Sequence, residues 1–165
     1  MVAQLIIAVP LVGAVLIWMS RRNPNRREAV TLVTAGALFA LVASLFPEVT
    51  DGARPAAVLV ETLPGLPIAI EVEPLGLLFA LIASFLWIVT SIYSIGYMRG
   101  HKEKHQTRFY IYFAVALSSA MGVAFAANMF TLFVFYEVLT LSTYPLVTHA
   151  GTDEAKRGGD RKSVV

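Results

Sequence analysis

The sequence of 165 residues contains no cysteine, and only 15% of its residues are charged. Without cysteine, the chain has no disulfide framework, no thiolate metal site and no iron–sulfur ligands of its own. An ordinary soluble domain carries about 25% charged residues, so the low charge excludes that class. The glycine-rich nucleotide-binding loops, the H-E-x-x-H zinc motif and the G-x-S-x-G elbow are also missing. The sequence therefore indicates no cofactor, no metal and no catalytic site of its own.

Apolar residues are correspondingly abundant and make up 57% of the chain. They occur in blocks of roughly twenty, the length that a helix needs to cross about 30 Å of hydrocarbon. The first block lacks the basic region of a signal peptide, so we interpret it as a retained helix and not as a cleaved signal. We expect an all-α membrane protein with about five transmembrane helices, over residues 2–19, 29–46, 75–98, 109–127 and 129–148.

The segment 47–74 differs from the apolar blocks because it is rich in proline, glycine and carboxylates. Within it, 58–61 and 68–73 alternate apolar with other residues on either side of a Leu-Pro-Gly-Leu-Pro sequence at 63–67. Alternation about a turn sequence is typical of a β-hairpin. We therefore predict a small external hairpin between the second and third helices.

The basic residues are distributed unevenly among the loops. Lysine and arginine number four in 20–28, four in 99–108 and four in the tail, whereas Arg54 is alone in 47–74. The positive-inside rule then predicts an amino terminus and a hairpin outside the cell (inner) membrane, with the basic loops and carboxyl tail in the cytoplasm. Because the net charge of +2 lies in short loops between spans, it indicates membrane topology and not a nucleic-acid partner.

Glu137 is the only acidic residue that lies well inside a predicted span. A charged group at this depth costs about 2.5–3.5 kcal/mol, so such residues usually face a bundle interior or a water-filled cavity. We interpret Glu137 as a participant in proton or cation passage; the alternative is a protonated carboxylic acid that joins two helices. The predicted spans contain no lysine or arginine, so a cation that modulates Glu137 must come from another chain or from sequence beyond residue 165.

Other polar residues are weaker candidates. Thr140 and Tyr144 follow Glu137 at i+3 and i+7, which places them on its helix face as candidate pathway-lining residues, and Pro145 is a candidate kink. For Thr140 or Tyr144 taken alone, packing or hydrogen bonding between helices is the more common use. His101 and His105 have metal-ligand spacing, but their loop is short and basic, so we interpret them as solvated.

Three runs together resemble the antiporter-like membrane subunits: V-E-P-L-G-L-L-F at 72–79, S-I-Y-S-I-G-Y-M at 91–98 and L-F-V-F-Y-E-V at 132–138. That family comprises the proton-translocating subunits of respiratory complex I, their relatives in membrane-bound hydrogenases and the large subunits of Mrp-type sodium/proton antiporters. The resemblance implies that Glu137 is the family's essential glutamate, which modulates a lysine on a later helix, and that the hairpin braces neighbouring subunits. The stretch around Glu137 looks nearer the Mrp D-like group.

Family members are much longer than this chain, and 160–165 do not begin a sixth span. We therefore interpret 1–159 as the amino-terminal transmembrane part of such a subunit and 160–165 as a polar tail, the result of truncation, frameshift or gene splitting. The expected function is membership in a multisubunit monovalent cation/proton antiporter or NADH:quinone oxidoreductase-type complex, in which other subunits would carry any electron transfer. The expected partners are other membrane subunits, the lipid bilayer, protons, and Na⁺ or K⁺. A non-transporting structural module is the alternative.

Overall fold

The computed structural model describes residues 1–101 and 105–148. Its elements are α1 (Val2–Met19), α2 (Pro24–Ser44), α3 (Phe46–Thr50), β1 (Ala56–Leu63), β2 (Leu66–Glu71), α4 (Pro74–Gly100), α5 (Gln106–Ala124) and α6 (Met129–Val147). Five helical segments are long and apolar enough to cross a membrane, α2 and α3 counting as one. The prediction of about five transmembrane helices, with a hairpin between the second and third, is confirmed.

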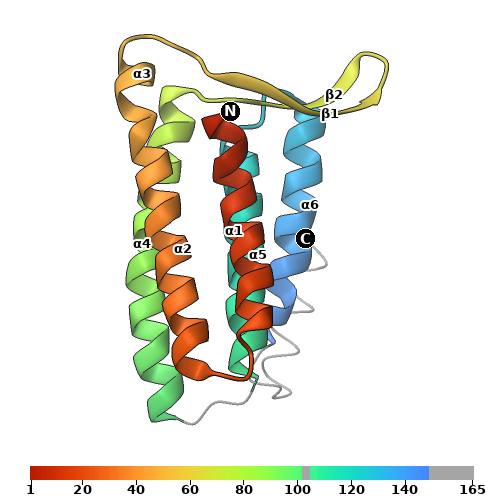
Figure 1. Cartoon of the computed structure of the whole chain (residues 1–165). Coiled ribbons are helices and arrows are strands. Elements are labelled where there is room, and N and C mark those ends of the chain that lie inside the picture. The colour runs from red at the N-terminus through yellow and green to blue at the C-terminus, as the bar shows by residue number, and fades with distance from the viewer. Residues whose placement is uncertain (102–104, 149–165) are drawn as a thin grey trace.

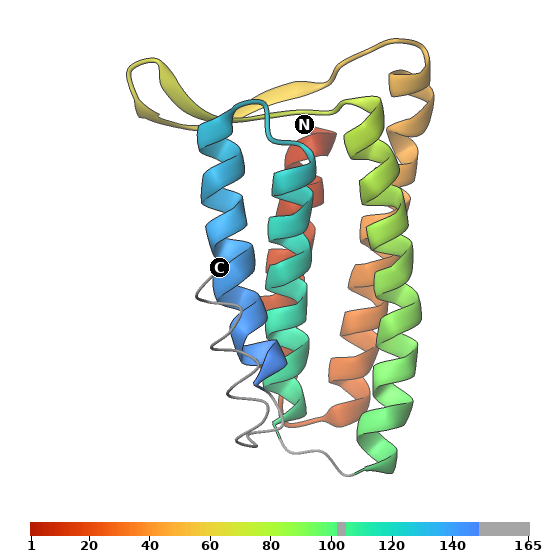
Figure 2. The same ribbon diagram turned by 180° about the vertical axis from the view of Figure 1, so that it is seen from behind.

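The long helices stand side by side in a single bundle (Figures 1 and 2). Helix α1 packs against α2 and α5, α2 also packs against α4, and α4 completes the arrangement by contacting α5. Helix α6 packs mainly against α5 and stands at the edge of the bundle. One side of α6 is therefore left uncovered by the other described helices.

Two glycines allow neighbouring helices to approach closely. A Cβ atom built on Gly13 would collide with Thr34 of α2, and one built on Gly122 would collide with the ring of Phe135 of α6. Transmembrane helices associate largely through such small-residue contacts, because lipid tails are as apolar as the side chains themselves. Gly122 thereby sets the distance between α5 and the helix that carries Glu137.

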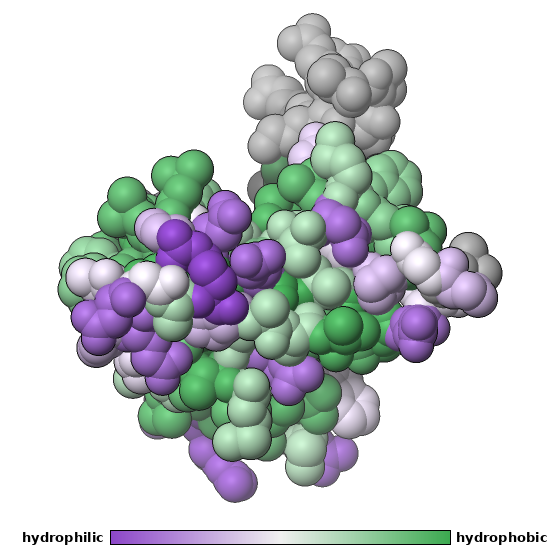
Figure 3. Space-filling view, turned by 90° about the horizontal axis from the view of Figure 1, so that it is seen from above, coloured by the Kyte–Doolittle hydropathy of each residue, from purple (hydrophilic) through white to green (hydrophobic). Residues whose placement is uncertain are grey.

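The hairpin lies across one end of the bundle, and its turn uses Pro64 and Gly65, the latter with φ of 83°. A proline followed by a glycine with positive φ is typical of a type II turn. Two strands alone are marginally stable, but β2 gains a further partner in the link from α5 to α6. The Glu71 N–H donates to the Phe125 carbonyl at 2.8 Å, and the Ala127 N–H donates to the Ala69 carbonyl at 3.0 Å. Figure 3 looks onto this end, where hydrophilic side chains are exposed between apolar ones.

Helix α2 begins earlier than the sequence predicts, at Pro24 instead of residue 29. The Asn23 side chain accepts a hydrogen bond from the Arg26 N–H at 3.3 Å, and Pro24 occupies the first turn. Asparagine at the N-cap and proline at the first helical position are both strong helix-start signals. The predicted basic loop is therefore partly helical, and Arg27 and Glu28 lie in the first turns of α2.

Candidate functional site

Glu137 lies close to the midpoint of α6, which runs from Met129 to Val147. Its side chain is exposed in the described chain. The structure gives its carboxylate no hydrogen bond or ion pair with any described residue. A carboxyl group thus stands halfway along an apolar helix without a partner in this part of the chain.

The packing face of α6 explains this exposure. Thr131 and Ser142 are its two buried residues, and Phe135 packs against α5. At about 100° of rotation per residue, all three lie roughly opposite Glu137. Only 11% of an apolar 18-residue stretch of α6 is buried, against 39% of the corresponding stretches of α1 and α5. The sequence-based expectation that Glu137 faces protein or water therefore requires cover from something other than the described residues.

Thr140 and Tyr144 lie on the same side of α6 as Glu137. The Thr140 hydroxyl donates to the Tyr136 carbonyl at 3.0 Å, and Tyr144 is 42% exposed. Pro145 cannot donate to the Leu141 carbonyl, yet the helix continues past it to Val147. The structure groups Thr140 and Tyr144 with Glu137 on one face of α6. Their role as pathway lining, and that of Pro145 as a kink, stay predictions.

A second charged site, which sequence reasoning missed, lies at the end of the bundle opposite the hairpin. The side chains of Arg27 and Glu28 are each only 6% exposed. Arg99, near the end of α4, forms two hydrogen bonds with the Glu28 carboxylate. Its Nε donates to Oε1 at 3.1 Å and its Nη2 donates to Oε2. The Arg27 Nη2 lies 3.6 Å from the same Oε1. One carboxylate thereby serves two guanidinium groups.

Arg27 extends this cluster to α5. Its Nη1 donates to the Thr107 hydroxyl at 3.0 Å and its Nη2 donates to the Gln106 side-chain oxygen at 2.7 Å. Its guanidinium carbon lies 5.4 Å from the centre of the Tyr110 ring. The cluster therefore joins α2 to α4 by ion pairs and α2 to α5 by hydrogen bonds. The Asn-Pro start of α2 is the sequence signal that could have placed Arg27 and Glu28 on a helix.

The two histidines of the basic segment are both exposed. The His101 ring nitrogen Nδ1 lies 3.0 Å from the Tyr97 carbonyl, and His105 has a positive φ of 59° just before α5. Glu103 lies outside the described residues. Within the described ranges, no three histidine, aspartate or glutamate side chains gather closely enough to hold a metal.

The arrangement of apolar helices is that of a multi-pass membrane protein. Residues 64–110 match the family model of the N-terminus of NADH-ubiquinone oxidoreductase (complex I) chain 5. Over 101 residues, the chain is 29% identical to the Na⁺/H⁺ antiporter subunit A1 of Staphylococcus aureus strain bovine RF122 / ET3-1, and equally to that of strain Newman. The alignments cover 61% of this chain but only 12% of those relatives.

The predicted resemblance to antiporter-like membrane subunits is thereby confirmed. A solved structure agrees in fold: a chain of the membrane-bound sulfane sulfur reductase, an archaeal respiratory membrane complex, matches with a TM-score of 0.73 at 20% identity. That match covers 86% of this chain and 22% of the other. Because the curated relatives are A-type subunits, the nearer likeness to the D-like group stays a prediction.

Proposed function

We propose that this chain supplies a transmembrane part of a subunit in a multisubunit monovalent cation/proton antiporter or NADH:quinone oxidoreductase-type complex, and that Glu137 takes part in proton translocation. The observation that carries the proposal is the carboxyl group at the middle of α6, on the face that the described helices leave uncovered. The similarity to Na⁺/H⁺ antiporter subunits supports the same class of function.

The cost of charge in hydrocarbon supports a covered Glu137 in the assembled complex. A charged side chain facing acyl chains at midspan costs several kcal/mol, which cover by protein or water would remove. Further membrane subunits, or further helices of the parent subunit, are the natural cover for this face of α6. They would also supply the cation that the described part of α6 does not offer to Glu137.

The two ends of the bundle support one orientation. The α1–α2 turn lies at the end opposite the hairpin, as does the end of α4 (Figure 1). These turns carry most of the described arginines, so under the positive-inside rule they face the cytoplasm and the hairpin faces outward. The amino terminus, beside the hairpin, is then also outside.

A structural module that packs against partner helices without carrying ions is the second candidate. The close α5–α6 contact at Gly122 favours it, since such packing alone would justify α6 in an assembly. On this view Glu137 would act as a protonated group that bonds to a neighbouring helix.

Glu137→Gln in the assembled complex separates the two functions. We expect cation-dependent proton flux in inverted vesicles to fall by roughly 10²-fold, the effect of removing a positioned proton-transfer group. Glu61→Gln is the matched control, because Glu61 is an exposed carboxylate of the hairpin. Native gels would verify that both variants assemble. Normal flux in an assembled Glu137→Gln complex would refute proton translocation by this residue and favour the structural module.

A further inference from the structure

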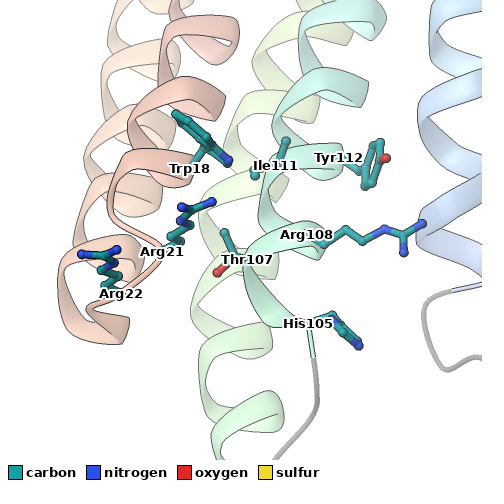
Figure 4. A pocket seen from close by; sticks show the side chains of 8 residues that line it. All are labelled: Trp18, Arg21, Arg22, His105, Thr107, Arg108, Ile111 and Tyr112. Atoms are coloured by element: carbon teal, nitrogen blue, oxygen red, sulfur yellow. The ribbon is translucent and has the colours of Figure 1, made fainter.

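A basic pocket opens at the end of the bundle opposite the hairpin, between the end of α1 and the start of α5. It has a volume of about 640 Å³. Figure 4 shows Arg21 reaching from the end of α1 toward Thr107 and Ile111 of α5, while Arg108 points along the side of α5 that faces α6. The pocket thus draws its lining from segments that are distant in the sequence.

Among its described lining residues, the pocket carries positive charge without a matching carboxylate. Arg21, Arg22 and Arg108 line it together with His105, and none of its described lining residues is acidic. None of the three arginines forms an ion pair with a described residue. By contrast, Arg27 and Arg99 both pair with the carboxylate of Glu28. Because no described carboxylate pairs with the three arginines of the pocket, they can attract an anionic ligand.

Two of these arginines lie beside aromatic rings. The Arg21 guanidinium carbon lies 5.1 Å from the centre of the Trp18 ring, and that of Arg108 lies 5.6 Å from the centre of the Tyr112 ring. Contact with an aromatic face leaves the N–H groups at the guanidinium edge able to donate. The guanidinium edge matches the geometry of phosphate oxygens, which accept bidentate hydrogen bonds.

The depth of the pocket identifies the source of the phosphate. Trp18 lies in the last turn of α1, where an apolar span ends, and tryptophan and tyrosine are enriched at the level of lipid headgroups. Ile111 adds an apolar wall suited to the start of an acyl chain. We propose that this pocket binds the phosphodiester headgroup of an anionic phospholipid.

Trp18 provides the test. In a Trp87→Phe background it is the only tryptophan, so quenching of its fluorescence reports the lipid at the pocket. The 165-residue chain would be reconstituted in phosphatidylcholine bilayers that contain increasing fractions of brominated phosphatidylglycerol or brominated phosphatidylcholine. We expect preferential quenching by phosphatidylglycerol. The preference should fall by roughly fivefold for each arginine removed in Arg21→Gln and Arg108→Gln.

Arg26→Gln is the matched control, because Arg26 is exposed at the same end and does not line the pocket. It should retain the preference. Equal quenching by both lipids, or equal loss in Arg26→Gln and Arg21→Gln, would overturn the site. Inorganic phosphate at constant ionic strength tests the other source: a preference that survives it supports the lipid. If phosphate, but not chloride, changes Trp18 fluorescence in pure phosphatidylcholine bilayers while phosphatidylglycerol gives no preferential quenching, the pocket binds a free anion and the lipid proposal is overturned.

Discussion

The two carboxylates Glu28 and Glu137 both lie in apolar helices, but their surroundings are opposite. Glu28 is buried and bound by two arginines, so the chain itself satisfies its charge. Glu137 lies at midspan on an uncovered face and has no partner among the described residues. A carboxylate that is paired within its own chain can stabilise the fold. A carboxylate without a described partner at midspan requires another helix, another subunit or water to cover it. The difference separates a structural carboxylate from a candidate functional one.

Glu28→Gln should have the largest effect on stability. It leaves Arg27 buried without a counter-charge, and breaking a buried pair by removing one partner typically costs 3–5 kcal/mol. Because Arg99 is half exposed and can be solvated, we expect the lower end, a fall of about 3 kcal/mol in the free energy of unfolding. Unfolding of the detergent-solubilised chain by a denaturing detergent would measure it.

Glu137→Gln is the control for that experiment, because it makes the same chemical change at a side chain with no described partner. Its free energy of unfolding should change by less than about 0.5 kcal/mol. Equal losses in the two variants would show that the assumed contrast between a satisfied and an unsatisfied carboxylate is false.

Gly122→Ala tests the contact that positions the helix of Glu137. The added methyl group would collide with the ring of Phe135, and overpacking of this kind costs about 1–3 kcal/mol. Gly36→Ala is the matched control: its Cβ would meet no atom within 4 Å, and alanine is the better helix former. The same unfolding measurement should show a loss for the first variant and none for the second. A tolerated Gly122→Ala would mean that the α5–α6 contact is loose.

Much of the fold was predictable from local sequence. The apolar blocks have the length of a membrane span, and Pro64-Gly65 between alternating segments predicts the hairpin turn. The docking of the hairpin onto the link between α5 and α6 was not predictable, because those hydrogen bonds join residues that are distant in the sequence.

The candidate site was predictable in part. Glu137 is conspicuous as a lone carboxylate in an apolar block, and its position near the middle of α6 follows from the limits of that block. Its exposure depends on which face of α6 meets α5. The faces of this helix differ little in hydrophobicity, so the sequence does not indicate which one packs. The cluster of Glu28 and Arg99 was missed because the pair is 71 residues apart in the sequence and because the charge of 20–28 resembles a loop.

Ser118→Ala should have the smallest effect on stability, because it removes a single hydrogen bond between two helices away from both carboxylates. The buried Ser118 hydroxyl donates to the Ile7 carbonyl of α1 at 2.7 Å. Hydrogen bonds between membrane helices average about 0.6 kcal/mol, so we expect a loss of that size in the free energy of unfolding. Ser44→Ala is the control, because Ser44 is exposed and its hydroxyl bonds only within α2. If both variants behave alike, the hydrogen bond from α5 to α1 contributes nothing measurable to the free energy of unfolding. Having a partner would then not distinguish a polar group energetically from Glu137, which has no partner among the described residues.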